Sequence, residues 1–131
     1  MSGNPQGVPA ESMLLRRDEG GVVTLTLNRP AQFNSLSIEL IKALQSELER
    51  IGRDPQARVV VIAGSGKAFC AGHDLKEMRS DDSKAFQKAL FDRCGRLMLT
   101  ITSIPQPVIA RVHGIATAAG CQLVAMCDLA V

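Results

Sequence analysis

A chain of 131 residues is long enough to bury one hydrophobic core without metal or disulfide support. Its composition, 46% hydrophobic and 21% charged, is typical of a globular protein. The net charge of +2 is too balanced for a nucleic-acid-binding surface, so we expect no nucleic-acid partner. Aromatic residues make up 3% of the chain, which argues against base-stacking platforms and aromatic ligand cages.

The N-terminal residues 1–12 are rich in Gly, Pro, Ser and Asn, and we expect them to form a disordered leader before one domain over residues 13–131. They lack the pattern of a signal or transit peptide, and no apolar run in the chain is long enough to cross a bilayer. The cysteines have neither C-x-x-C nor zinc-finger spacing, so we expect reduced thiols in a reducing, aqueous compartment. They lie at positions 70, 94, 121 and 127.

Regular structure in the first half begins with two β-rich runs, 14–17 and 22–27, around the hairpin turn Asp18-Glu19-Gly20-Gly21. A helix is predicted from Ser37, as N-cap, to about residue 53 because apolar residues recur three or four apart. The continuous β-branched run 58–63 predicts a strand buried on both faces.

The second half continues the alternation of helices and strands. Helices are predicted over 74–78, 83–104 and 119–127, and strands over 108–112 and 129–131. This alternation predicts an α/β fold with at least some parallel pairing. Because the sequence stops where a core strand starts, we expect it to be the front part of a larger domain.

The loop Gly64-Ser65-Gly66-Lys67 invites interpretation as a phosphate-binding loop. A Walker motif would require Gly at position 61 and Ser or Thr at position 68, where the chain has Val61 and Ala68. A dinucleotide-binding motif would require Gly at position 69, which is Phe69. The spacing therefore argues against nucleotide hydrolysis.

Two small-residue turns, Ala71-Gly72-His73-Asp74 and Thr117-Ala118-Ala119-Gly120, each stand between a predicted strand and a helix start. N–H groups at a helix start lack intrahelical acceptors, and the helix dipole favours negative charge there. If the turns converge, they can form an oxyanion hole. The alternative is that the small residues only allow tight packing of helix on strand.

The segments 67–78 and 112–123 together resemble the two signature segments of the crotonase (enoyl-CoA hydratase/isomerase) superfamily, and Asn28-Arg29-Pro30 resembles its strand exit. The pairing is most similar to the branch called enoyl-CoA hydratase domain-containing protein 3. The resemblance implies a spiral of β-β-α units, here the N-terminal part, that binds acyl-CoA thioesters and assembles as a homotrimer or hexamer. It implies no tightly bound cofactor and no metal; coenzyme A is part of the substrate.

By position, the resemblance places the two oxyanion N–H groups on His73 and Ala119, and turns the Ala71 carbonyl toward the adenine of coenzyme A. It implies that Arg29 and Lys76 are solvated at the mouth of the site and contact phosphate. The full set of positions assigned to coenzyme A is Arg29, Ala71, Gly72, Asp74, Lys76 and Gly120.

Gln122 stands where hydratases of this family carry Glu, and an amide can orient a water but cannot accept its proton. The family's second acid would follow Val131. We therefore expect a hydratase or isomerase of enoyl-CoA in fatty-acid metabolism, or alternatively a non-catalytic acyl-CoA-binding or regulatory protein. Asp128 and His113 are interpreted as structural residues, and Cys70 and Cys121 as small buried residues. The expected location is the cytoplasm of a bacterium, or the mitochondrial matrix of a eukaryote after presequence removal, without membrane association.

Overall fold

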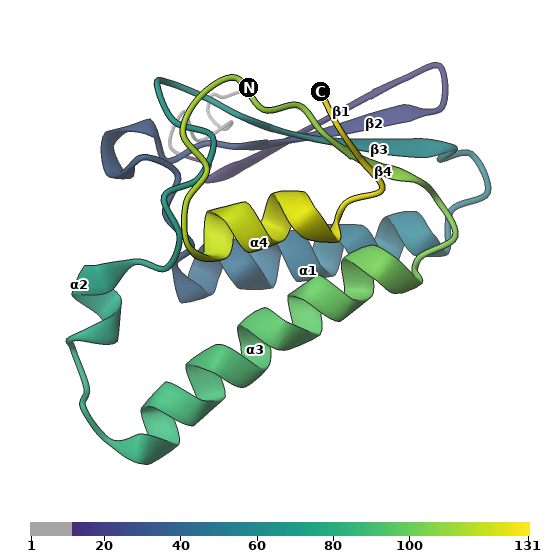
Figure 1. Ribbon diagram of the computed structural model, residues 1–131. Helices are drawn as coiled ribbons and strands as arrows, with labels where there is room; N and C mark the ends of the chain where they lie inside the picture. The colour runs from purple at the N-terminus through teal and green to yellow at the C-terminus, as the bar shows by residue number, and fades with distance from the viewer. Residues whose placement is uncertain (1–11) are drawn as a thin grey trace, which may run out of the picture.

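The computed structural model describes residues 12–131 (Figure 1), so the predicted leader lies outside the described residues except for Ser12. A five-stranded sheet has the order β1-β2-β3-β4-β5, with β1 antiparallel to β2 and every later pair parallel. The strands are β1 (Leu14–Glu19), β2 (Val22–Leu27), β3 (Val59–Gly64), β4 (Val108–Ala110) and β5 (Leu129–Ala130). The helical elements are η1 (Pro30–Gln32), α1 (Ile38–Gly52), α2 (Leu75–Met78), α3 (Lys84–Ser103) and α4 (Ala119–Met126). The predicted α/β class is confirmed.

Helices α1, α3 and α4 lie on one face of the sheet (Figure 1). Side chains alternate between the two faces of a strand, so every second residue of the central strands is buried under these helices. The prediction that residues 58–63 are buried on both faces is wrong within the described chain. Val60 and Ile62 are fully buried, whereas Val59 and Val61 are only partly covered, because no helix formed by residues 12–131 packs over their side of the sheet.

The predicted helix starts are confirmed by side-chain caps. Ser37 accepts a hydrogen bond from the Leu40 N–H, and Ser83 accepts one from the Phe86 N–H. The predicted short helix is α2, whose N-cap Asp74 accepts from two backbone N–H groups of its first turn. Each helix boundary falls within two residues of its predicted position.

Three successive units repeat one plan, in which a sheet strand leads to a short bridging segment and then to a helix. The bridging segments pair in parallel: Leu36 with His73, and Cys70 with Ala116. Only two of these units were recognised from the sequence, by their small-residue turns. The first unit, around Leu36, was missed because it has no such turn. These bridges form a second layer that aligns the starts of the helices.

Among residues 12–131, no helix combines the length and apolarity needed to span a membrane. All four cysteines lie in this range, and none forms a disulfide within it.

Candidate functional site

Three loops leave the carboxyl ends of β2, β3 and β4 and run along the same edge of the sheet toward α1, α2 and α4 (Figure 1). Parallel pairing requires this arrangement because parallel strands end on the same side. In open α/β sheets, ligands bind at this edge. Both small-residue turns from the sequence lie on these loops.

The first turn is held against the loop that precedes α1. The Ala71 N–H donates to the Phe33 carbonyl at 3.0 Å, and the Leu36 N–H donates to the Gly72 carbonyl at 2.7 Å. The Asp74 N–H donates to the Leu36 carbonyl at 3.1 Å. Within residues 12–131, the His73 N–H between these bonds has no acceptor.

The second turn is held by Cys70, whose carbonyl accepts the Thr117 N–H at 3.1 Å. The turn closes when the Gly120 N–H donates to the Thr117 carbonyl at 2.8 Å. Ala118, inside it, has φ 52° and ψ −125°, a conformation that favours glycine. In the described part of the chain, the Ala119 N–H that follows has no acceptor.

The two turns touch at their glycines. A Cβ atom on Gly72, whose φ is +93°, would lie 3.1 Å from the Ala118 Cβ and 3.4 Å from the Ala119 nitrogen. A Cβ atom on Gly120 would overlap the Cys70 carbonyl oxygen. The small residues therefore do allow tight packing. Because of this packing, the Ala119 N–H lies next to the turn that contains the His73 N–H.

The expectation that Arg29 is solvated is wrong, whereas its contact with phosphate stays a prediction. Its side chain is 16% exposed and pairs with the Asp74 carboxylate at 3.0 Å. The guanidinium also donates to the Ser35 carbonyl at 2.6 Å. Arg29 thus fastens the first turn to the loop after β2, so its charge is already occupied by the protein.

Asp74 is likewise a structural partner of this turn. Burial raises the pKa of its carboxyl group, but hydrogen bonds from the Glu77 N–H and the Arg29 guanidinium outweigh that effect, and the pKa is lowered from 3.8. Asp74 is therefore a carboxylate that caps α2 and holds Arg29. Of the positions assigned to coenzyme A, Lys76 is exposed, and the Ala71 carbonyl accepts no hydrogen bond among residues 12–131.

A mostly apolar groove of about 510 Å³ runs between α3 and α4. Gln122 lines it, one turn after the Ala119 N–H, together with Phe91 and Met126. The ring of Phe91 meets the His73 imidazole edge-on, with centroids 5.3 Å apart. Burial lowers the pKa of His73, opposed by Glu77, so the imidazole is neutral near pH 7.

The structural interpretation of two other polar residues agrees with their contacts. Asp128 accepts a hydrogen bond from the Val108 N–H at 2.8 Å and so pins the start of β4. The His113 Nε2 lies 2.7 Å from the carbonyl oxygen of Gly66, which belongs to the loop Gly64-Ser65-Gly66-Lys67.

The two cysteines beside the site differ. Cys70 is buried, and this burial raises the pKa of its thiol to about 11. Cys121 is exposed on α4, so its interpretation as a buried residue is wrong.

Sequence reasoning missed Phe33 and Asn34, which both have positive φ, 54° and 55°. Asn34 is fully buried, and its amide accepts from the Arg29 N–H and donates to the Ser65 and Ala68 carbonyls. The only sequence signal was the Asn itself, a residue enriched in the left-handed region.

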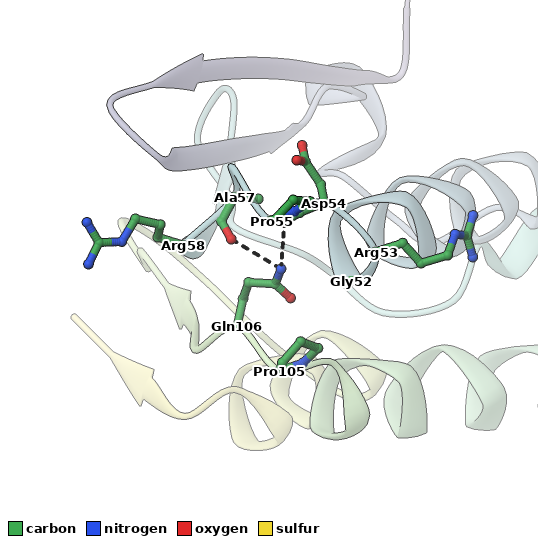
Figure 2. Close-up of a pocket in the computed structure, with 8 residues that line it drawn as sticks. All are labelled: Gly52, Arg53, Asp54, Pro55, Ala57, Arg58, Pro105 and Gln106. Atoms are coloured by element: carbon green, nitrogen blue, oxygen red, sulfur yellow. Dashed lines mark hydrogen bonds between the residues drawn. The ribbon is translucent and has the colours of Figure 1, made fainter.

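A second hollow lies elsewhere, at the edge where β3 and β4 begin. It measures about 620 Å³, and Gln106 donates hydrogen bonds to the Asp54 and Ala57 carbonyls beside it (Figure 2). These bonds, with one to the Ile51 carbonyl, hold the end of α1. The hollow is remote from both small-residue turns. Within the described range, no cluster of three or more His, Cys, Asp or Glu residues could hold a metal ion.

The chain matches the family model described as enoyl-CoA hydratase/isomerase over residues 17–131. It therefore belongs to the enoyl-CoA hydratase/isomerase family, the crotonase superfamily, as the sequence motifs predicted. A curated relative from Xenopus laevis, "Enoyl-CoA hydratase domain-containing protein 3, mitochondrial", is 44% identical over 115 residues, which are 88% of this chain and 39% of the relative. The similarity to that branch is confirmed.

Solved structures confirm the crotonase fold. An enoyl-CoA hydratase from Mycobacterium smegmatis is 62% identical with a TM-score of 0.89, covering 92% of this chain and 47% of that one. Human enoyl-CoA hydratase domain-containing protein 3 is 38% identical with a TM-score of 0.86, covering 91% and 47%. The chain thus spans less than half the length of these relatives.

Proposed function

We propose that this chain contributes the thioester-binding part of an acyl-CoA-binding crotonase, nominally an enoyl-CoA hydratase or isomerase of fatty-acid metabolism. One observation carries the proposal: two touching turns each offer a main-chain N–H group, of His73 and Ala119, without an acceptor in residues 12–131. Family membership supports the choice of a CoA thioester as the ligand.

The chemistry follows from where charge develops. Polarising the thioester carbonyl makes its α and β carbons reactive, and the oxygen becomes negative as an enolate forms. Two fixed N–H donors, of His73 and Ala119, stabilise that oxygen by about 3 kcal/mol each. The donors need no reorganisation because the Cys70 carbonyl and Leu36 already hold the turns.

The remaining contacts fit the parts of an acyl-CoA. The Ala71 carbonyl, which accepts no hydrogen bond among residues 12–131, is an acceptor for the adenine amino group, and exposed Lys76 is a phosphate contact. Gly72 and Gly120 let the turns approach, and the Arg29–Asp74 pair holds the first turn in place beside the ligand. The groove between α3 and α4 offers apolar surface for the acyl chain.

Gln122 decides between an enzyme and a binder. Hydration of an enoyl thioester adds the hydroxyl group of water to the β carbon and its proton to the α carbon, which requires a proton acceptor. The Gln122 amide cannot accept a proton. This favours the second candidate, a catalytically weak or non-catalytic acyl-CoA-binding or regulatory protein.

The test compares hydration of crotonyl-CoA with calorimetric binding of butyryl-CoA, which cannot be hydrated. We expect binding by the wild-type protein, and a rise in hydration of about a hundredfold or more in Gln122→Glu. Gln56→Glu makes the same chemical change on an exposed turn at the opposite edge and should change neither value. Binding without turnover supports the binder, whereas absence of butyryl-CoA binding contradicts both candidates.

Assembly and location complete the proposal. We expect a homotrimer or hexamer, to be checked by light scattering. The relative from Xenopus laevis is named as mitochondrial and Mycobacterium smegmatis is a bacterium, so a mitochondrial matrix and a bacterial cytoplasm both stay proposals. Cell fractionation distinguishes them.

A further inference from the structure

The interior of α3 contains a glycine that the packing of the helix does not require. Glycine destabilises a helix interior relative to alanine, so its presence there calls for a reason. A Cβ atom built on Gly95 would meet nothing within 4 Å except its chain neighbours and the adjoining backbone of α3. At Gly120, by contrast, a Cβ atom would overlap the Cys70 carbonyl oxygen. Packing within residues 12–131 therefore explains Gly120 but not Gly95.

Gly95 lines the groove between α3 and α4 (Figure 1). Residues four apart on a helix share one face, so Phe91, Gly95 and Leu99 form one wall of the groove. Gln122 and Met126, also four apart, line it from α4. Phe91 and Leu99 are 51% and 67% exposed, and between them the wall has no side chain. We call this gap the Gly95 notch.

The groove is continuous with the candidate site. Gln122 follows Ala119 by about one turn of α4, a rise of about 5 Å. The first carbons of an acyl chain can span that distance, so a thioester held by the Ala119 N–H can extend its acyl group into the groove. The groove volume of about 510 Å³ is within the range of roughly 300–1,000 Å³ that is usual for small-molecule sites.

The charged side chains of the groove already have partners. Asp92 pairs with Lys88 at 2.6 Å, and Arg96 pairs with Glu49 at 3.3 Å. Neither Lys88 nor Glu49 lines the groove. The lining therefore suits a neutral acyl group better than one that ends in a carboxylate.

The apolar part of the lining favours an aromatic ring over a linear chain. The exposed ring of Phe91 can pair edge-to-face or offset with a second ring. Met98 and Met126 also line the groove, and thioether sulfurs make favourable contacts with aromatic rings. A ring needs extra width at one point, which the Gly95 notch provides, whereas a linear chain does not.

We propose that Gly95 is a specificity-determining residue that admits acyl groups carrying an aromatic ring, with the ring in the notch beside Phe91. This inference rests on the proposed function, because it names the class of acyl group that the same site binds. A larger side chain at position 95 excludes the ring but leaves room for a narrow linear chain.

The experiment compares a ring with a linear chain. Calorimetric titration measures the binding of 3-phenylpropionyl-CoA, hexanoyl-CoA and butyryl-CoA, none of which can be hydrated. The wild-type protein should bind 3-phenylpropionyl-CoA about threefold or more tightly than hexanoyl-CoA, since only the ring gains aromatic contacts. Gly95→Leu should lower the ratio of these two affinities about tenfold, because the leucine side chain occupies the notch.

Two further variants serve as controls. Gly95→Ala fills less of the notch, so it should lower the ratio by a smaller factor than Gly95→Leu. Both residues are better helix formers than glycine, so neither variant should melt below the wild-type protein. Ala89→Leu adds a leucine at an exposed position of α3 that does not line the groove, and it should leave the ratio unchanged.

A wild-type protein that does not prefer the ring, or a ratio that Gly95→Leu leaves unchanged, would overturn the assignment of Gly95 while the proposed function stands. Absence of butyryl-CoA binding by the wild-type protein would overturn the proposed function and this inference with it.

Discussion

Ala118 adopts φ 52° and ψ −125° at the turn that leads into α4. A side chain in this region costs about 1–3 kcal/mol, and only glycine adopts it freely. The conformation closes the turn from Thr117 to Gly120 and leaves the following N–H, that of Ala119, without an acceptor within the described residues. The strain is therefore located where the proposed oxyanion contact is made.

Replacement of Ala118 by glycine should stabilise the protein. Relief of the strain exceeds the extra chain entropy of glycine, which is about 0.5–1 kcal/mol, so we expect a net gain of about 1 kcal/mol. Urea unfolding measures it as a higher midpoint at an unchanged slope. Ala125→Gly is the matched control: it makes the same change in an exposed position of α4 and should lower stability by about 1 kcal/mol. A lower midpoint for Ala118→Gly would contradict the assignment of strain.

At the scale of elements, the start of α4 is pressed against the loop that follows β3. Gly120 lies against the Cys70 carbonyl, and Cys70 pairs with Ala116 in the second layer of bridges. Any side chain at position 120 must push α4 away from this loop. The spacing between the two turns, and so between their N–H groups, depends on this contact.

Two glycine-to-alanine replacements in helices should have opposite effects. Gly120→Ala should cost about 3 kcal/mol because its Cβ overlaps backbone that cannot rotate away. Gly95→Ala, in the interior of α3, should instead gain up to about 1 kcal/mol, since no atom other than the adjoining backbone of α3 lies within 4 Å of its Cβ and alanine is the better helix former. Thermal unfolding of both variants checks the pair. Equal effects would mean that the contact between α4 and the loop is not tight.

Elements with local signals were predictable from the sequence. Ser37, Asp74 and Ser83 cap helices at the expected places because a cap depends on neighbours along the chain. The coverage of β3 was not predictable from its apolar run, since burial of Val61 depends on what packs over the far face of the sheet. The bridge at Leu36 also escaped prediction because it is set by a partner 37 positions away, at His73.

Across the whole molecule, the sequence motifs predicted the correct family. They also predicted that the two small-residue turns can converge, because the spacing of the motifs reflects backbone geometry. Side-chain roles were less predictable. Arg29 looked like a free cation because its partner, Asp74, is 45 residues away in the sequence. Phe33 was missed because nothing local marks an aromatic residue at positive φ. Both roles are set by contacts between loops that are distant along the chain.

The Arg29–Asp74 pair joins the loop after β2 to the loop after β3, so it should contribute to global stability in a pH-dependent way. Asp74→Asn keeps a capping side chain but removes the charge, leaving Arg29 largely buried without its partner. We expect a loss of about 2–3 kcal/mol at pH 7, measured by urea unfolding. Asp82→Asn, which changes an exposed aspartate, should lose less than about 0.5 kcal/mol.

The sign of the pH dependence follows from the lowered pKa of Asp74. Its folded pKa is below the ordinary 3.8, so its contribution is complete above that pH and is lost as the pH falls through the folded value. The stability difference between wild type and Asp74→Asn should therefore be constant from pH 7 to about pH 5 and should shrink below pH 3.8. A difference that persists unchanged into strong acid would mean that the carboxylate charge does not hold the two loops together.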